Sequence, residues 1–185
     1  MSDAASTSAG VTAFDALPDH DAVPLLESCC GSQAWVQGML AHRPFGTLVR
    51  VLNEADEIWW SLTPDDWLEA FDHHPRIGEQ VAAAPQGAAA KAWSADEQRA
   101  ASAAGAETRQ ALADGNRAYE RRFGHIYLVC ATGRSAEEML ASLRQRLSND
   151  PATELRVAAA EQAKITRLRL ERLFTPAPTP TRPLR

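Results

Sequence analysis

Two long segments of the chain place apolar side chains at the 3.6-residue spacing of an amphipathic helix. The first covers residues 48–62, the second covers residues 155–173, and charged positions lie on the opposite face of each. The stripe positions are Leu48, Val51, Leu52, Ala55, Ile58, Trp59 and Leu62, and then Leu155, Ala158, Ala159, Gln162, Ile165, Leu168 and Leu173. The pattern predicts two helices whose apolar faces pack against the rest of the protein.

Capping residues indicate where further helices begin and end. Thr63-Pro64-Asp65-Asp66 combines an N-cap threonine, a proline at the first helical position and acidic residues in the first turn. Ser135-Ala-Glu-Glu138 is a capping box, and Asn149-Asp150-Pro151 starts another helix. Gly124 ends a helix that runs through residues 116–123. Because strand patterns are almost absent, we predict an all-α, single-domain bundle of about seven or eight helices.

One short segment departs from the helical pattern. Residues 125–130, HIYLVC, form an apolar run with β-branched and aromatic side chains. Periodicity does not distinguish an extended segment from a buried helical turn over so short a run, so both interpretations stay open. We expect irregular loops over residues 72–93 and 123–134.

The two ends of the chain differ from its centre in composition. Residues 1–12 are small and polar, and they are predicted to be a disordered tail. Residues 175–185 alternate proline with threonine and cannot continue a helix, so a flexible tail is expected there. The helical domain is therefore predicted to span residues 13–174.

Composition narrows the function classes. The 185 residues are 45% hydrophobic and 23% charged, as in an ordinary globular protein. A net charge of −5 argues against nucleic-acid binding, and the lack of an apolar run of roughly 20 residues argues against a membrane span. No secretory signal is recognisable. The three cysteines, Cys29, Cys30 and Cys130, contain no CxxC pair, so we expect reduced thiols and a cytoplasmic location.

The sequence FDHHPRIGEQ, residues 71–80, is the first candidate for chemistry. Pro75 disfavours helical geometry in the residue before it, so His74 is expected just past a helix end on a stiff turn. His73 and His74 point to opposite sides of an extended segment and no usable ligand spacing exists, so no metal site is expected. An ordinary helix-ending turn fits the same geometry. An imidazole suits acid–base chemistry because its ordinary pKa is about 6.5.

The segment Ser94-Ala95-Asp96-Glu97-Gln98 supports two interpretations. Ser94 with Glu97 is a capping box, and the spacing alone favours an ordinary helix start. A helix N-terminus also offers free N–H groups and a positive dipole end, so Glu97 and Gln98 there could bind an amide- or urea-like ligand.

The last helical segment carries charges of both signs. Its arginines alternate with acidic residues, which is typical of a solvated helix face, and Arg169 is interpreted on sequence statistics as a surface charge. The charged residues in question are Arg167, Arg169, Arg172, Glu154, Glu161 and Glu171.

Four separated blocks of the sequence are informative together: HHPRIGE, WSADEQ, NRAYERRFGHIYLVCATGRS and RLSNDPATELRVAAAEQAKITRLRLERL. With Arg43-Pro44-Phe45, they resemble the 2-oxo-4-hydroxy-4-carboxy-5-ureidoimidazoline (OHCU) decarboxylase family, in the right order over roughly residues 12–174. The resemblance implies an all-α fold, a homodimer, and decarboxylation of OHCU to (S)-allantoin, the last step of urate conversion.

The resemblance also implies which residues form the site. The family's catalytic histidine precedes Pro-Arg-Ile-Gly and corresponds to His74, and Glu97 and Arg169 are implied as the other catalytic residues. The implied substrate-binding residues are Pro75, Ser94, Ala95, Asp96, Glu97, Gln98, Tyr127, Leu128, Val129, Cys130 and Ala131. An alanine-rich insert at residues 81–92 lengthens the spacing between His74 and Glu97 relative to some family members.

The implied reaction requires no cofactor, because the C=N bond of the substrate accepts the electrons that the departing CO₂ leaves behind. The sequence shows no phosphate-binding glycine loop and no GxSxG motif, in agreement with that expectation. Two alternatives stay open: a non-catalytic helical module that binds a partner, and a decarboxylase that acts on a related purine-derived ring.

Overall fold

The computed structural model describes residues 2–77, 93 and 104–175. Within these ranges the protein has eight helices and no strand, which confirms the all-α prediction. The helices are α1 (Ser2–Asp15), α2 (Asp19–Cys29), α3 (Gln33–Ala41), α4 (Leu48–Ser61), α5 (Pro64–Asp72), α8 (Ala106–Phe123), α9 (Ala136–Arg146) and α10 (Pro151–Phe174).

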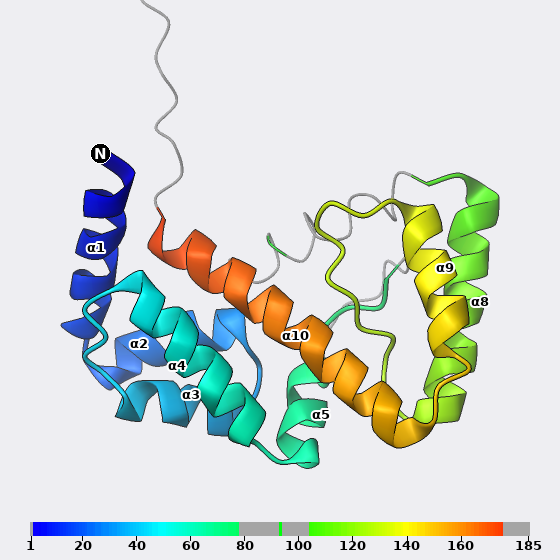
Figure 1. Ribbon diagram of the computed structural model, residues 1–185, viewed down its shortest axis with the longest axis horizontal. Helices are drawn as coiled ribbons and strands as arrows, with labels where there is room; N and C mark the ends of the chain where they lie inside the picture. Colours follow the sequence, from blue (N-terminus) through cyan, green and yellow to red (C-terminus); the bar gives the residue numbers. More distant parts are fainter. Residues whose placement is uncertain (1, 78–92, 94–103, 176–185) are drawn as a thin grey trace, which may run out of the picture.

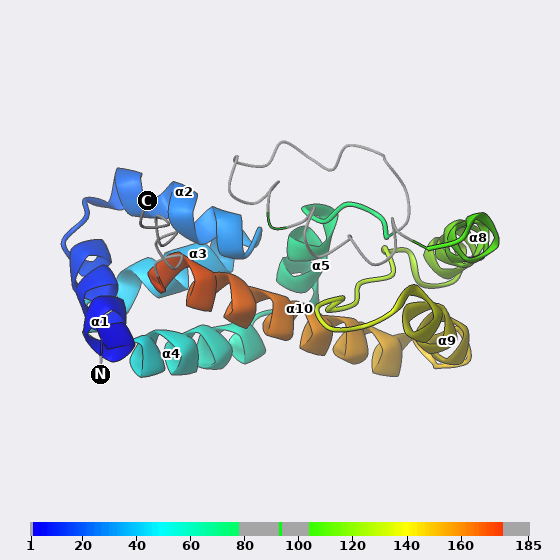
Figure 2. The ribbon, with the colours of Figure 1, turned by 90° about the horizontal axis from the view of Figure 1, so that it is seen from above.

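Helix α10 organises the molecule. It runs along the length of the protein, with α1 to α4 around one end, α8 and α9 at the other, and α5 between them (Figure 1). The perpendicular view in Figure 2 shows the same order. Because α10 packs against α1, α2, α4, α5 and α8, one helix carries side chains to both ends of the fold.

The helix starts follow the capping signals of the sequence. Thr63 and Asp66 form a reciprocal capping box at α5, and Ser135 and Glu138 form another at α9. The Asp150 side chain accepts a hydrogen bond from the Thr153 amide at the start of α10. Gly124 ends α8 with φ of 78°, a left-handed conformation that glycine adopts without a steric penalty. These boundaries confirm the predicted ones.

Two hydrophobic clusters form the core. The larger cluster lies among α1 to α5 and α10, and the smaller one lies among α8, α9 and the segment before α9. Gly115 allows α8 and α9 to approach closely, since a Cβ there would lie 2.4 Å from Cδ2 of Leu143.

The segment over residues 125–130 forms neither a helix nor a strand, which excludes the buried helical turn that its apolar sequence left open. Ile126 and Leu128 belong to the larger cluster, whereas Tyr127 and Val129 belong to the smaller one. Successive side chains of an extended chain point to opposite sides, so this segment is apolar throughout because both of its faces are buried.

The beginning of the chain differs from its prediction. In place of the expected disordered tail, residues 2–15 form α1. Val11 and Phe14 are buried in the larger cluster. The rings of Phe14 and Phe174 pack edge to face, with 5.3 Å between their centroids. The Asp15 carboxylate accepts hydrogen bonds from the amides of Phe45 and Gly46. Contacts with distant segments hold this helix, and local composition does not reveal them.

Among the described residues, no helix has both the length and the apolar content that crossing a bilayer demands. Residues 73–77 and 124–135 lie outside the helices, in agreement with the two predicted irregular regions; most of the first region, residues 78–92, lies outside the described residues.

Candidate active site

His74 lies just beyond the end of α5, where the sequence placed it. Its amide donates a hydrogen bond to the carbonyl of Phe71, and its side chain is 8% exposed. The loop after His74 is tied to α8, because Arg76 makes two hydrogen bonds with Glu120 (2.6 and 2.9 Å) and Asn116 donates to the Ile77 carbonyl at 2.6 Å. The rigidity inferred from Pro75 is therefore reinforced by contacts with another helix.

His73 has a different environment. Its Nδ1 lies 2.9 Å from the Glu69 carbonyl oxygen, and its ring covers the backbone of Gly31. A Cβ at Gly31 would lie 2.3 Å from Cγ of His73, so only glycine leaves room for the ring. The described residues contain no group of three histidine, cysteine, aspartate or glutamate side chains placed to hold a metal ion.

Arg169 is buried, with 3% of its surface exposed, so the interpretation of this residue as a surface charge is wrong. It lies on the face of α10 that packs against α2, and its guanidinium donates to the Ser28 carbonyl at 3.3 Å. The apolar stripe of this helix predicted which positions face the core, but it did not include Arg169. An arginine is buried only where the segment that packs against the helix supplies a partner for it.

The environment of His74 keeps its imidazole uncharged. Burial lowers the pKa of His74 well below 6.5, and the positive charge of Arg169 lowers it further. The polar side chain of Gln162 acts in the opposite direction, and His73 makes a smaller contribution that lowers the pKa. At neutral pH the His74 ring therefore carries one N–H and one nitrogen lone pair, and it can accept a proton.

Two further polar side chains on α10 accompany Arg169. Gln162 is fully buried and its Nε2 donates to Oγ1 of Thr166 at 3.0 Å. Positions 162, 166 and 169 share one helix face, and we refer to His74, Gln162, Thr166 and Arg169 as the His74 group. Gln162 is part of the predicted apolar stripe, and its polar contact was not predicted. An amide at a core position of that stripe was the available signal.

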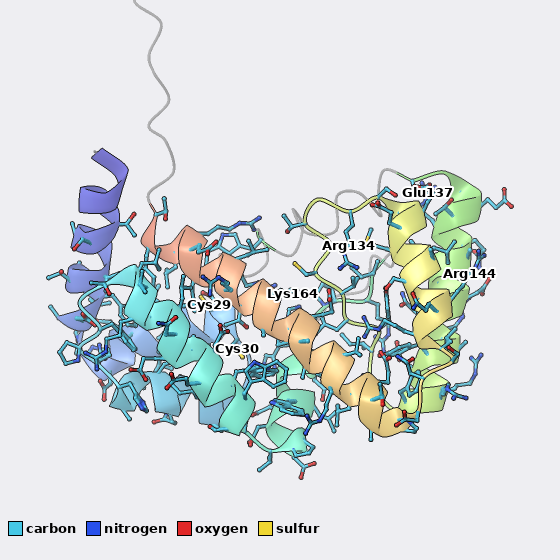
Figure 3. The ribbon with its side chains drawn as sticks, in the orientation of Figure 1. Cys29, Cys30, Arg134, Glu137, Arg144 and Lys164 are labelled. Carbon is cyan, nitrogen blue, oxygen red and sulfur yellow. The ribbon has the colours of Figure 1, made fainter. Side chains whose placement is uncertain are left out.

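Two cysteines lie next to the His74 group. Cys29 and Cys30 are buried free thiols at the end of α2, beside α10 (Figure 3). Burial raises the pKa of each thiol to about 12. Since the thiolate is the nucleophilic form of cysteine, neither residue is suited to covalent catalysis.

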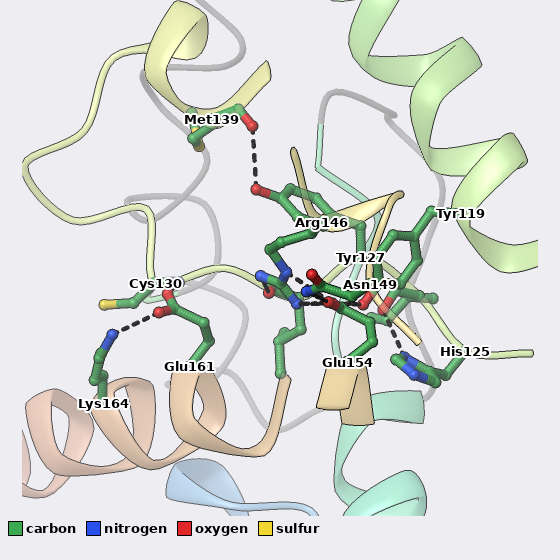
Figure 4. A network of polar contacts seen from close by, with 12 residues as sticks. Tyr119, His125, Tyr127, Cys130, Met139, Arg146, Asn149, Glu154, Glu161 and Lys164 are labelled. Carbon is green, nitrogen blue, oxygen red and sulfur yellow. Dashed lines mark hydrogen bonds and ion pairs between the residues drawn. The ribbon is translucent and has the colours of Figure 1, made fainter. Parts of the chain in front are cut away.

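The segment Tyr127–Ala131, the second part of the implied site, is held through its backbone (Figure 4). The Cys130 amide donates to the Glu161 carboxylate at 2.8 Å, and the Leu128 carbonyl accepts from Arg146 at 2.8 Å. Burial alone would raise the pKa of Glu161, but its hydrogen bonds with Lys164 and Cys130 outweigh burial and lower it. Glu161 therefore holds the segment as a carboxylate.

The other anchor of this segment is a buried cluster, the Arg146 network, formed by Tyr119, Arg146, Asn149 and Glu154 (Figure 4). Arg146 donates to Glu154 at 2.7 Å, Asn149 donates to the other carboxylate oxygen at 2.7 Å, and the Tyr119 hydroxyl also donates to Glu154. The Arg146 guanidinium lies 4.8 Å from the centre of the Tyr127 ring.

The predicted solvated face of the last helix needs a correction. Glu154 is completely buried and Glu161 is 6% exposed, so neither lies on a solvated face. Arg167 and Arg172 are exposed as predicted. The two glutamates are buried because each meets donors from segments remote in sequence, which the pattern of α10 alone does not indicate.

The structure thus places Arg169 near His74, and it holds the segment 127–131 through Glu161 of α10 at Cys130 and Arg146 of α9 at Leu128. The implied site residues Ser94, Ala95, Asp96, Glu97 and Gln98 lie outside the described residues. Trp93, which precedes them, packs against the larger hydrophobic cluster.

Comparison with known proteins finds similarity over most of this chain. The model of the OHCU decarboxylase family matches residues 15–171. A uric acid degradation bifunctional protein, TTL, of Arabidopsis thaliana is 37% identical over 148 residues, which cover 80% of this chain and 45% of that protein. An OHCU decarboxylase of Amia calva is 43% identical over 56 residues, 30% of this chain and 32% of that protein. The chain thus spans less than half the length of these relatives.

Solved structures show the same similarity. A crystal structure of OHCU decarboxylase in the presence of (S)-allantoin superimposes with a TM-score of 0.71 and 34% identity, covering 85% of this chain and 99% of that one. A crystal structure of (S)-allantoin synthase has a TM-score of 0.64 at 16% identity, covering 86% of this chain and 52% of that one, and supports the fold alone.

Proposed function

Because this chain belongs to the OHCU decarboxylase family, we propose that it is a carboxy-lyase that converts OHCU to (S)-allantoin in urate degradation. The observation that carries the proposal is a buried, uncharged His74 beside a buried Arg169. The similarity to a decarboxylase structure determined in the presence of (S)-allantoin supports it, since that similarity covers nearly the whole of the other chain.

The chemistry explains why so few groups suffice. The substrate carries a carboxylate and a hydroxyl on one ring carbon, next to a C=N bond. When the bond to the carboxylate breaks, its electron pair moves toward the C=N bond, so the substrate is its own electron acceptor. The protein has to orient the carboxylate, stabilise the charge that moves, and deliver a proton to one face of the ring.

His74 is the proposed acid–base catalyst. A neutral imidazole accepts the proton of the substrate hydroxyl as CO₂ leaves, and the imidazolium then returns that proton to the carbon of the former C=N bond. The ring nitrogen, which received the electron pair, takes a second proton from water, so one proton is consumed for each CO₂ released. Burial and Arg169 lower the pKa of His74, which keeps the free base available at neutral pH and makes the imidazolium a strong acid. Delivery from one fixed side would yield a single enantiomer.

Arg169 is the proposed partner of an anionic substrate group, because a guanidinium matches a carboxylate with two parallel hydrogen bonds. The backbone of residues 127–131, Pro75, Ser94, Ala95, Asp96 and Gln98 are proposed to bind the ureido and ring amides, with Glu97 as a further catalytic carboxylate. The anchoring of Leu128 and Cys130 supports the first part of this assignment, since fixed backbone groups bind amides with little reorganisation.

We further propose a cytoplasmic homodimer without bound nucleic acid. The buried free thiols of Cys29 and Cys30 suit a reducing compartment, and the net charge of −5 disfavours polyanions. Size-exclusion chromatography with light scattering tests the dimer.

The activity is tested by circular dichroism of urate mixed with urate oxidase and hydroxyisourate hydrolase, with and without this protein. A rapid (S)-allantoin signal that persists in a metal chelator is expected. Slow formation of racemic allantoin at the same rate in both samples would contradict the proposal and favour a related ring or a non-catalytic role.

A further inference from the structure

Gln162 has three features that are not needed in a residue whose only role is to pack in the core. It is fully buried, it is polar, and it lies on the α10 face that carries Arg169, near the ring of His74. A leucine or methionine would fill the same space without a desolvation cost, so the amide must bond to something in the site.

The orientation of the Gln162 amide is fixed from one side. Its Nε2 donates to Oγ1 of Thr166 at 3.0 Å, so the opposite atom, Oε1, has to point away from Thr166. Thr166 also lies beside Cys30, and its side chain lowers the pKa of that thiol. The side chain of Gln162 raises the pKa of His74, which is the effect of an acceptor, so the amide oxygen and not the NH₂ group is the atom that acts on the ring.

Gln162 Oε1 is a buried acceptor that makes no well-directed hydrogen bond within the part of the chain that the structure describes. The His74 ring is the neighbouring group able to donate to it. Hydrogen bonds of catalytic groups are often long or poorly aligned before substrate binds, and they shorten in the complex.

We propose that Gln162 is a positioning residue that accepts the N–H of His74 and so fixes which ring nitrogen carries the proton. The other ring nitrogen then keeps its lone pair on the substrate side. This role rests on the proposed function only in its consequence for catalysis; the tautomer itself is a property of the free protein.

An amide suits this role better than a carboxylate. The charged or titratable groups that act on His74 are Arg169 on α10 and His73 on its own loop. A carboxylate at position 162 would pair with Arg169 and attract a second proton to His74. The neutral amide orients the ring without adding charge, so the ring remains a base at neutral pH.

The direct test is ¹⁵N NMR of the histidine side chains in the free protein, with the His74 signals assigned by their loss in His74→Asn. One dominant neutral tautomer is expected at pH 7.5. In Gln162→Met, which keeps the volume and helix propensity, a mixture of both tautomers is expected. Thr166→Val, which releases Nε2 of the amide, should give a smaller shift in the same direction. Unchanged His74 signals in Gln162→Met would overturn the proposal.

Kinetics separate positioning from substrate contact. Gln162→Met should lower kcat on the order of tenfold and leave KM within about twofold, as for loss of a group that orients a base. Gln162→Glu should move the acidic limb of the kcat/KM profile to higher pH. A raised KM with unchanged kcat would instead mean that Gln162 binds substrate, and would overturn the proposal. A wild-type protein with a single tautomer but no decarboxylase activity would contradict the proposed function alone.

Discussion

The Arg146 network and the His74 group, two buried polar clusters along α10, differ in how their charges and hydrogen bonds are satisfied. In the Arg146 network a guanidinium faces a carboxylate, and donors from Tyr119 and Asn149 complete the oxygens of Glu154. In the His74 group a guanidinium faces an imidazole whose protonation it disfavours, and an amide oxygen lacks a well-directed donor. The first arrangement satisfies its members within the protein, whereas the second holds a neutral imidazole whose free lone pair is available to a ligand.

The largest effect on the His74 group is expected from His74→Asn, which removes the base and keeps a small polar side chain. Activity should fall by about 10²- to 10⁴-fold, the usual contribution of acid–base catalysis, with the far-UV circular dichroism unchanged. The coupled (S)-allantoin assay measures it. The matched control is His73→Asn, for which a mild effect is expected; equal losses in both variants would show that the wrong histidine was chosen.

For the Arg146 network, Glu154→Gln is expected to affect stability above all. It leaves the buried Arg146 without its counter-charge, which costs about 3–5 kcal/mol in comparable buried pairs. Urea denaturation measures the loss. The control is Glu171→Gln, whose partner Arg167 lies 3.4 Å away on the same exposed helix face, and about 0.5 kcal/mol or less is expected there. Similar losses of unfolding free energy in the two variants would contradict the difference between the buried and the exposed ion pair.

A smaller effect is expected at Gly31, which supports the loop that carries His74. In Gly31→Ala the new methyl group would overlap the His73 ring, so the ring and the loop must move. Overpacking of this kind costs about 1–3 kcal/mol, and kcat should fall as well because His74 is displaced. Gly105→Ala is the control, since a Cβ at Gly105 meets no atom within 4 Å. A Gly31→Ala protein with unchanged activity and stability would contradict the close packing of the His73 ring on Gly31.

The smallest effect concerns pH. The pKa of His74 is lower in the folded protein than the ordinary 6.5 of an unfolded chain, so the unfolded state binds a proton that the folded state does not. The contribution of His74 to the free energy of unfolding is therefore constant above pH 6.5 and decreases as pH falls below it, by on the order of 1 kcal/mol one unit lower. Denaturation of wild type and His74→Asn at pH 7.5 and 5.5 isolates this contribution, because the other histidines are common to both. Parallel losses in the two proteins would contradict the lowered pKa.

The elements that local chemistry specifies were predicted well. The capping boxes at Thr63 and Ser135, Asp150 at α10 and Gly124 at the end of α8 depend on neighbours within four residues, and the structure confirms them. The proline rule placed His74 beyond the end of α5 for the same reason.

What the sequence did not reveal depends on distant contacts. Helix α1 is held by Phe45 and Phe174, which lie far along the chain from Phe14. Glu154, Glu161 and Arg169 are charged residues on a helix whose pattern suggests a solvated face, and they are buried because partners from other segments reach them. Gln162 was visible as an anomaly within an apolar stripe, but its neighbours were not.

Both polar groups depend on the continuity of α10. Glu154 and Arg169 are separated by 15 residues of one helix, roughly 22 Å at 1.5 Å per residue. Adding or deleting one residue between positions 154 and 162 would rotate everything downstream by about 100° and carry Gln162 and Arg169 away from His74. Substitutions on the exposed face of α10 should be tolerated, whereas any change in the number of residues between the two groups should abolish the site even if each side chain is retained.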